Sequence, residues 1–171
     1  MQTYERSVRV RAPLSRVWEF HSTTDGLEAL TPSWMNMHIR EVRGPDGSPD
    51  PDVLDVGSLV DVSIRPFDVG PQQNWTSNIT AREEENGSAY FRDEMTDGPF
   101  EAWEHTHLFY ADGDGTIVRD RIRYELPLGA VGRALGPLAV VGFEPMFRYR
   151  HRRTKQLLET EPEEPSVQPR A

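Results

Sequence analysis

The chain has 171 residues, of which 36% are hydrophobic and 27% are charged. This composition is typical of one globular domain and excludes a bundle of membrane-spanning helices. The absence of cysteine excludes disulfides, thiolate nucleophiles and cysteine-ligated metal clusters. Because the first residues carry no apolar signal region, we expect a cytoplasmic protein.

The charge is strongly acidic, with 28 Asp and Glu against 19 Lys and Arg and a net charge of −9. Lys155 is the single lysine, so arginine supplies nearly all the positive charge. This balance is typical of halophilic, salt-adapted proteins or of a GC-rich genome. An acidic chain repels phosphate backbones, and we therefore expect no nucleic-acid partner.

The N-terminal quarter predicts a strand followed by two short helices. Residues 3–11 alternate in polarity, and Pro13 suits the first position of a helix that runs to His21. Thr23 or Thr24 is placed to cap a second helix, which Thr31-Pro32 would end.

The middle of the chain predicts a polar loop and then a series of strands. The loop at 44–55 is rich in Asp and Pro but lacks the ligand spacing of a calcium-binding EF-hand, so we interpret it as solvated. Six stretches alternate with period two, and the turns between several of them have hairpin chemistry. The predicted strands are 35–43, 58–65, 72–84, 88–96, 101–111 and 116–126.

The C-terminal part predicts a long helix over about 130–158, with Pro137 and Pro145 expected to break or kink it. The domain is expected to span 1–160, and 161–171 is expected to be a disordered acidic tail. The element order indicates an α+β fold. In it, a curved antiparallel sheet of about seven strands wraps around the long helix and leaves a cavity between them.

Strand alternation indicates which side chains face that cavity. Ionisable groups are unexpected on such apolar faces, because a buried Asp or His is costly unless it is paired. The inward polar residues are Asp93, His105, His107, Asp120 and Tyr124, and the inward aromatic residues include Trp75, Phe91, Trp103 and Phe109.

Pairing partners depend on the register of two hairpins. A turn centred on Gly113-Asp114 places His107 opposite Asp120, whereas a turn at Asp112-Gly113 places His105 there. Around a three-residue loop at 97–99, Asp93 would lie opposite Trp103.

The polar cluster has three interpretations. It is a satisfied structural network, a ligand pocket, or a metal site built on the His105-x-His107 pair. Because hydrogen bonding between Asp and His explains the pair equally well, we predict no metal and no cofactor. On the late helix, Phe147 and Arg150 are spaced so that this arginine can reach the cavity, toward an aspartate or an anionic ligand group.

Several local strings resemble the START-like, or SRPBCC, superfamily and in particular a small prokaryotic ligand-binding group labelled polyketide cyclase/dehydrase-like. The resemblance covers about residues 3–158 and implies the helix-grip fold with a hydrophobic cavity. No stretch aligns with the iron motif of the dioxygenase branch, so iron is not inferred. The strings are Pro13-Leu14-x-x-Val17-Trp18-Glu19-Phe20-His21-Ser22, Gly98-Pro99-Phe100-x-x-Trp103-x-His105-x-His107-x-Phe109, Asp120-x-x-x-Tyr124-x-Leu126-Pro127 and Phe147-x-Tyr149-Arg150.

We therefore expect a protein that binds a small hydrophobic molecule, aromatic or lipid-like, in this cavity. The alternative is an enzyme of the cyclase or dehydratase type. In that case His105 or His107 would be the base, poised by Asp93 or Asp120, and Tyr124 would donate a proton. A third possibility is a partner-binding module that uses the arginine-rich helix. The candidate ligand-binding residues are Trp75, Phe91, Asp93, Trp103, His105, His107, Phe109, Asp120, Tyr124, Phe147 and Arg150.

Overall fold

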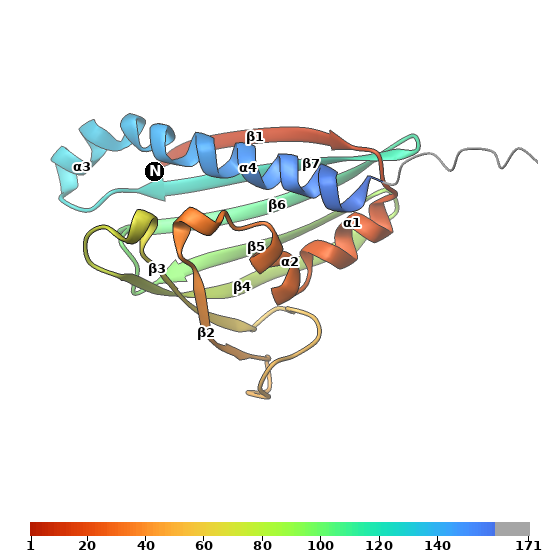
Figure 1. Cartoon of the computed structure of the whole chain (residues 1–171), viewed down its shortest axis with the longest axis horizontal. Helices are drawn as coiled ribbons and strands as arrows, with labels where there is room; N and C mark the ends of the chain where they lie inside the picture. Colours follow the sequence, from red (N-terminus) through yellow and green to blue (C-terminus); the bar gives the residue numbers. More distant parts are fainter. Residues whose placement is uncertain (160–171) are drawn as a thin grey trace, which may run out of the picture.

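The computed structural model describes residues 1–159, and the acidic tail expected at 161–171 lies outside these residues. The fold is the expected α+β helix-grip arrangement, in which one long helix packs on a seven-stranded antiparallel sheet (Figure 1). Among the described residues, no helix has both the length and the apolar character needed to cross a membrane.

The sheet has the strand order β1-β7-β6-β5-β4-β3-β2, so β1 adds to the far edge beside the last strand. Every neighbouring pair is antiparallel, as short hairpin connections require. The strands are β1 (Gln2–Val10), β2 (His38–Arg43), β3 (Leu59–Ile64), β4 (Gln73–Glu85), β5 (Ser88–Thr96), β6 (Ala102–Asp112) and β7 (Gly115–Glu125).

Two short helices follow β1, α1 (Leu14–His21) and α2 (Thr24–Ala29). Of the two capping candidates, Thr23 caps α2, because its hydroxyl accepts a hydrogen bond from the backbone N–H of Gly26. The strand predicted at 35–43 begins too early. A 3-10 turn, η1 (Ser33–Met35), and the left-handed residue Asn36 delay β2 until His38. A second 3-10 turn, η2 (Pro66–Asp68), follows β3.

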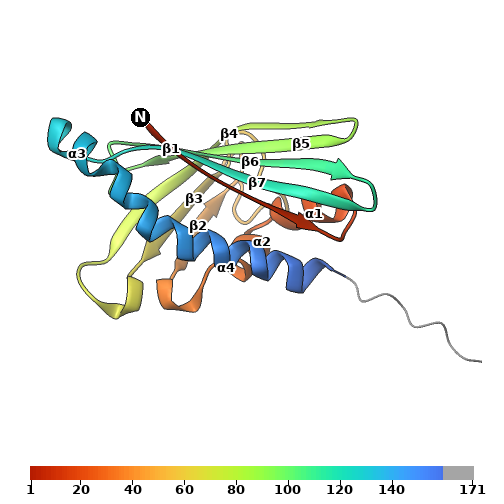
Figure 2. The same cartoon turned by 90° about the horizontal axis from the view of Figure 1, so that it is seen from above.

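The predicted C-terminal helix is divided, as its prolines indicated. It consists of α3 (Gly129–Leu135), a 3-10 turn η3 (Gly136–Ala139) and α4 (Val140–Leu158). Pro145 lies inside α4 at an exposed position, where the carbonyl that its missing N–H leaves free can bind water. Figure 2 shows α4 crossing one face of the sheet, with α3 projecting beyond it.

The apolar core has two parts on the face covered by α4. One part gathers α1 and the middle strands, where Trp18 packs edge-on against Phe109 with ring centroids 5.6 Å apart. The other joins β1 and β7 to α4 through Tyr4, Tyr124 and Phe143. Because His105 on β6 contacts Phe147 of α4, the polar cluster lies between the two apolar parts.

A β-bulge in β4 changes which side chains face inward. The pairing of β4 with β5 shifts between Ile79 and Ala81, so that Arg82 rather than Ala81 lies opposite Phe91. Regular alternation from Trp75, Ser77 and Ile79 would have placed Ala81 inward, and the bulge overturns that expectation. The Arg82 guanidinium lies 4.1 Å from the centre of the Trp18 ring and donates to Ser22 Oγ.

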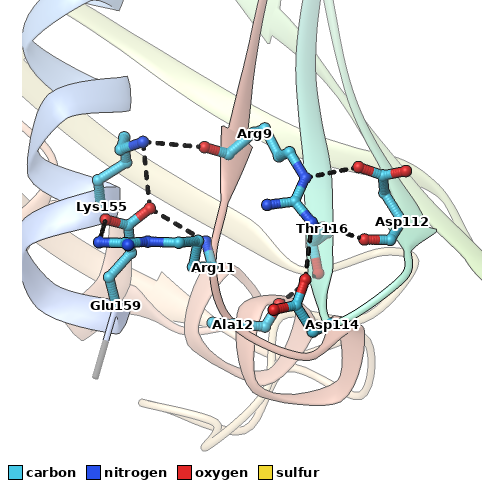
Figure 3. A network of polar contacts seen from close by, with 8 residues as sticks. All are labelled: Arg9, Arg11, Ala12, Asp112, Asp114, Thr116, Lys155 and Glu159. Atoms are coloured by element: carbon cyan, nitrogen blue, oxygen red, sulfur yellow. Dashed lines mark hydrogen bonds and ion pairs between the residues drawn. The ribbon is translucent and has the colours of Figure 1, made fainter. Parts of the chain in front are cut away.

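A surface network ties the C-terminal end of α4 to β1 and to the β6–β7 hairpin (Figure 3). Arg9 contacts Asp112 at 2.6 Å and Asp114 at 2.8 Å, while its carbonyl accepts a hydrogen bond from Lys155. Glu159 accepts from the backbone N–H of Arg11 and lies 3.1 Å from Lys155 Nζ. These contacts hold the last turn of α4 over the edge of the sheet.

The close approach of α2 to α1 predicts opposite effects for two glycine substitutions. A Cβ at Gly26 would lie 2.0 Å from the carbonyl oxygen of Phe20, whereas a Cβ at Gly142 in α4 meets nothing within 4 Å. We expect Gly26→Ala to lower the free energy of unfolding by about 2 kcal/mol through overpacking. We expect Gly142→Ala to raise it by about 0.5 kcal/mol through helix propensity. Urea denaturation of both variants is the measurement, and two changes of the same sign would contradict this packing.

Candidate functional site

A cavity of about 150 Å³ lies between the sheet, α2 and α4. Most of its wall is apolar. Asp93, His105, His107 and Arg150 gather where β5 and β6 meet α4. The apolar lining is Leu27, Leu30, Met35, Met37, Leu54, Val60, Val62, Ile64, Trp75, Ile79, Phe91, Met95, Trp103, Met146 and Phe147. The polar and charged lining is His21, Thr23, Thr31, Ser77, Asp93, His105, His107 and Arg150.

The polar end is set by strand register. On β6 and β7, His107 lies opposite Asp120 and Trp103 opposite Tyr124, which is the register of the turn centred on Gly113-Asp114. On β5 and β6, Asp93 lies opposite His105 rather than Trp103. The prediction for that hairpin is wrong because β5 ends at Thr96 and β6 starts at Ala102, so the connection is longer than three residues.

Asp120 is a buried carboxylate that faces three histidines. Its Oδ1 lies 2.8 Å from His105 Nε2, and its Oδ2 lies 2.6 Å from His151 Nε2. His107 Nδ1 is 3.2 Å from Oδ1, without the alignment of a hydrogen bond. Because a carboxylate only accepts, His105 and His151 each donate from Nε2 to Asp120.

Asp93 forms the other side of the cluster. Its Oδ1 accepts a hydrogen bond of 3.1 Å from Ser77 on the neighbouring strand. Its Oδ2 lies 3.4 Å from His107 Nε2 and 3.7 Å from His105 Nδ1. His105 and His107 therefore each lie between two carboxylates, and their rings are in contact at a centroid distance of 3.7 Å with a tilt of 37° between the planes.

The carboxylates of the cluster are held in their ionised form. Burial alone would raise the pKa of Asp120, but the three histidines outweigh it and hold that pKa well below its ordinary value. Burial likewise opposes ionisation of Asp93, and His107, His105 and Ser77 together lower its pKa. The cavity thus ends at the carboxylate of Asp93, and the buried carboxylate of Asp120 lies behind the histidine rings.

The pKa values of the two adjacent histidines shift in opposite directions. Burial and the neighbouring His107 lower the pKa of His105, which favours its neutral form. Burial also disfavours the charged form of His107, but Asp120 and Asp93 outweigh burial and raise its pKa.

Arg150 brings the compensating positive charge from α4. Its guanidinium lies 6.0 Å from the Phe147 ring and lines the cavity. Burial lowers the pKa of Arg150, and Asp120 and Asp93 oppose that shift.

Eight of the eleven candidate ligand-binding residues line the cavity, and three do not. Phe109 is fully buried against Trp18, and Asp120 lies behind the histidine rings. The Tyr124 hydroxyl donates to the carbonyl of Gly136 at 2.9 Å, so it is not directed at the cavity. Phe109, Asp120 and Tyr124 therefore lie outside the lining of this cavity.

The sequence reasoning missed three polar residues of the site, His151, His21 and Ser77. The signal for His151 was its spacing, because it continues the buried stripe of α4 formed by Phe143 and Phe147. His21 ends the apolar face of α1, where its Nδ1 donates to the Val17 carbonyl.

Within the described residues 1–159, one set of side chains is close enough to hold a metal ion. One nitrogen each from His105 and His107 and one carboxylate oxygen of Asp93 lie within 4.8 Å of one another. Chemically, the site combines an apolar chamber with a group of oxygen and nitrogen donors at one end.

One family model, described as "Domain of unknown function (DUF8410)", matches residues 8–158. No curated protein matches the sequence.

The fold is shared with solved structures of low sequence identity. Protein Ms6760 from Mycobacterium smegmatis is 18% identical, with a TM-score of 0.63 over 93% of this chain and 91% of that one. Norcoclaurine synthase from Thalictrum flavum, in complex with dopamine and hydroxybenzaldehyde, is 15% identical, with a TM-score of 0.64 over 95% and 89%. The major latex-like protein 151 from Panax ginseng is 14% identical, with a TM-score of 0.58 over 92% and 97%. At these identities the likenesses show that the chain shares the fold of these structures.

The position of Asp120 predicts a large difference between two Asp→Asn substitutions. Asp120→Asn removes the charge that three buried histidine rings face, and we expect a loss of about 3–5 kcal/mol in the free energy of unfolding. Asp112→Asn weakens a surface contact with Arg9, and we expect a loss below about 1 kcal/mol. Chemical denaturation at neutral pH compares them, and equal losses would contradict a central role for Asp120.

We expect the burial of His21 to account for part of the loss of folding stability in acid. Burial lowers its pKa to about 3 in the folded protein, although the hydrogen bond with the Val17 carbonyl opposes this shift. The unfolded chain takes up the proton near pH 6.5, so stability falls as the pH drops from about 6.5 toward 3, by up to about 1.4 kcal/mol per unit. We expect His21→Gln to flatten this dependence in denaturation series from pH 7 to 4. An unchanged slope would show that His21 does not contribute.

Proposed function

Since the chain belongs to the domain family of unknown function DUF8410, we propose its function from the site itself. The protein binds a small, largely apolar ligand in the cavity between the sheet, α2 and α4, and the polar cluster orients that ligand. The observation that carries the proposal is the cavity, which has apolar walls and ionised groups at one end.

The volume limits the size of the ligand. A cavity of 150 Å³ is similar to engineered protein cavities that accept benzene, so one aromatic ring or a short branched chain fits. Trp75, Trp103 and Phe91 supply flat surfaces for such a ring. The norcoclaurine synthase structure, which has the same fold, holds dopamine and hydroxybenzaldehyde, which are both single-ring aromatic molecules with oxygen substituents.

The polar end favours a ligand with one oxygen-bearing group. Arg150 is the cation at this end, and it lies close enough to Asp93 and Asp120 for their charges to act on it. A phenol or carboxylate oxygen directed at Arg150 would gain a charge-assisted hydrogen bond, while the ring stays among the aromatic side chains.

The alternative is an acid–base enzyme of the cyclase or dehydratase type. The His–Asp pair that it needs is present, with 2.8 Å between His105 Nε2 and Asp120 Oδ1. It lacks the expected proton donor, because the Tyr124 hydroxyl is engaged with Gly136. Ligand binding is therefore the function that the geometry supports better.

A matched pair of tryptophan substitutions tests the cavity. Met37→Trp fills part of the chamber from its wall, whereas Val141→Trp adds the same side chain at a position on α4 that is 75% exposed. With hydroxybenzaldehyde as the probe and tryptophan fluorescence as the readout, we expect saturable binding to the wild-type chain. We expect affinity to be at least about tenfold weaker in Met37→Trp and unchanged in Val141→Trp.

The control ligand is cyclohexane carboxaldehyde, which has a similar volume but neither the flat ring nor the phenol oxygen. Weaker binding of this control would support the proposed orientation. Failure of the wild-type chain to bind either aldehyde, or equal affinity in the two tryptophan variants, would overturn the proposal.

A further inference from the structure

The two adjacent histidines, His105 and His107, have more carboxylate neighbours than their N–H groups can satisfy. Each imidazole lies between Asp93 and Asp120, and a neutral ring carries only one N–H. His105 uses its N–H on Asp120, so a lone pair on its Nδ1 faces Asp93 Oδ2 at 3.7 Å. Two electron-rich atoms directed at each other call for a cation between them.

We propose that Asp93, His105 and His107 bind one divalent transition-metal ion, through Oδ2, Nδ1 and Nε2 respectively. The spacing of these atoms suits the role. Metal–ligand bonds of 2.0–2.2 Å at tetrahedral angles place neighbouring ligand atoms about 3.4 Å apart. The observed separations from Asp93 Oδ2 are 3.4 Å to His107 and 3.7 Å to His105.

The surrounding groups orient each ligand as metal sites require. A metal-binding histidine usually directs its other ring nitrogen at a carboxylate, as His105 does with its Nε2 toward Asp120, while His107 Nδ1 lies 3.2 Å from the same carboxylate oxygen. Ser77 donates to Asp93 Oδ1, which leaves Oδ2 for the ion. His151 donates to Asp120 from α4 and so fixes the carboxylate that fixes the rings.

The charge balance of the cluster also favours a cation. With both imidazoles neutral, as metal binding requires, the carboxylates of Asp93 and Asp120 carry two negative charges, and the guanidinium of Arg150 that lines the cavity supplies one positive charge. An uncompensated buried charge is costly, and a divalent ion removes that deficit. The donor set of two imidazoles and one carboxylate suits zinc, ferrous iron or cobalt better than magnesium or calcium, which prefer oxygen ligands.

Three protein ligands leave at least one coordination position, and Asp93, His105 and His107 all line the cavity. A divalent ion would leave the cluster with one excess positive charge, so this position would take an anionic oxygen, such as a carboxylate or phenolate. This inference goes beyond the proposed ligand binding, because the ion would bind to the chain whether or not an organic ligand is present.

Cobalt is the probe that tests the site. The full chain, freed of metal with a chelator, is titrated with Co²⁺ while the visible d–d absorption and the melting temperature are recorded. We expect one ion per chain, bands of four- or five-coordinate cobalt, displacement by Zn²⁺, and a higher melting temperature because the ion binds the folded state. A tenfold excess of Mg²⁺ should not compete.

Two variants and a control assign the ligands. His105→Gln should abolish the bands, and Ser77→Ala, which removes no ligand, should weaken cobalt binding by about ten- to a hundredfold. His38→Gln, at an exposed histidine on β2, should bind as the wild type does. The absence of saturable binding to the wild-type chain, a spectrum of six-coordinate aqueous cobalt, or loss of binding in His38→Gln would each overturn the proposal. The first of these would mean that the cluster is balanced by a proton on histidine instead.

Discussion

The structure of the site depends on one constraint, which is that the buried carboxylate of Asp120 must be surrounded by donors. It meets this requirement with histidines from its neighbouring strand and from α4, so the same interaction orients the rings and joins the helix to the sheet. Because His105 turns Nε2 toward Asp120, its other ring nitrogen is directed at Asp93 and the cavity. The polar network therefore holds the helix to the sheet with the same side chains that the proposed ligand and metal sites would use, and the two interpretations of the cluster are not exclusive.

The cavity follows from the same arrangement. On one side of the cluster, Phe143 and Phe147 of α4 pack against Tyr4 and Tyr124, and on the other side α1 packs against the middle strands. Apolar side chains line most of the space between them, and Asp93, His105, His107 and Arg150 line one end of it. A ligand that is apolar at one end and bears an oxygen at the other complements both parts. The size of the chamber, rather than any shared sequence with known binders, sets the ligand class that we propose.

Much of this arrangement could be predicted from the sequence, because regular alternation in β6 and β7 places their polar residues on one face. The sequence left two registers open, and the structure has the register of the Gly113-Asp114 turn. What failed has local physical causes. The bulge near Thr80 reverses which side chains face inward in the part of β4 that follows it, and so brings Arg82 inward. No residue pattern in the sequence indicates this bulge. The length of the β5–β6 connection decides whether Asp93 meets Trp103 or His105, and turn residues alone do not give that length. His151 lies among arginines in the sequence, so its place on the buried face of α4 was not apparent from composition.

The central claim is that Asp120 sets the proton positions of the histidines. The most direct test is ¹H–¹⁵N correlation NMR of the imidazole nitrogens in the metal-free full chain at neutral pH. We predict a proton on Nε2 of His105 and on Nε2 of His151, and an unprotonated Nδ1 on His105 that faces Asp93. A proton on Nδ1 of His105, with Nε2 bare, would contradict the account, because Asp120 would then not orient the ring.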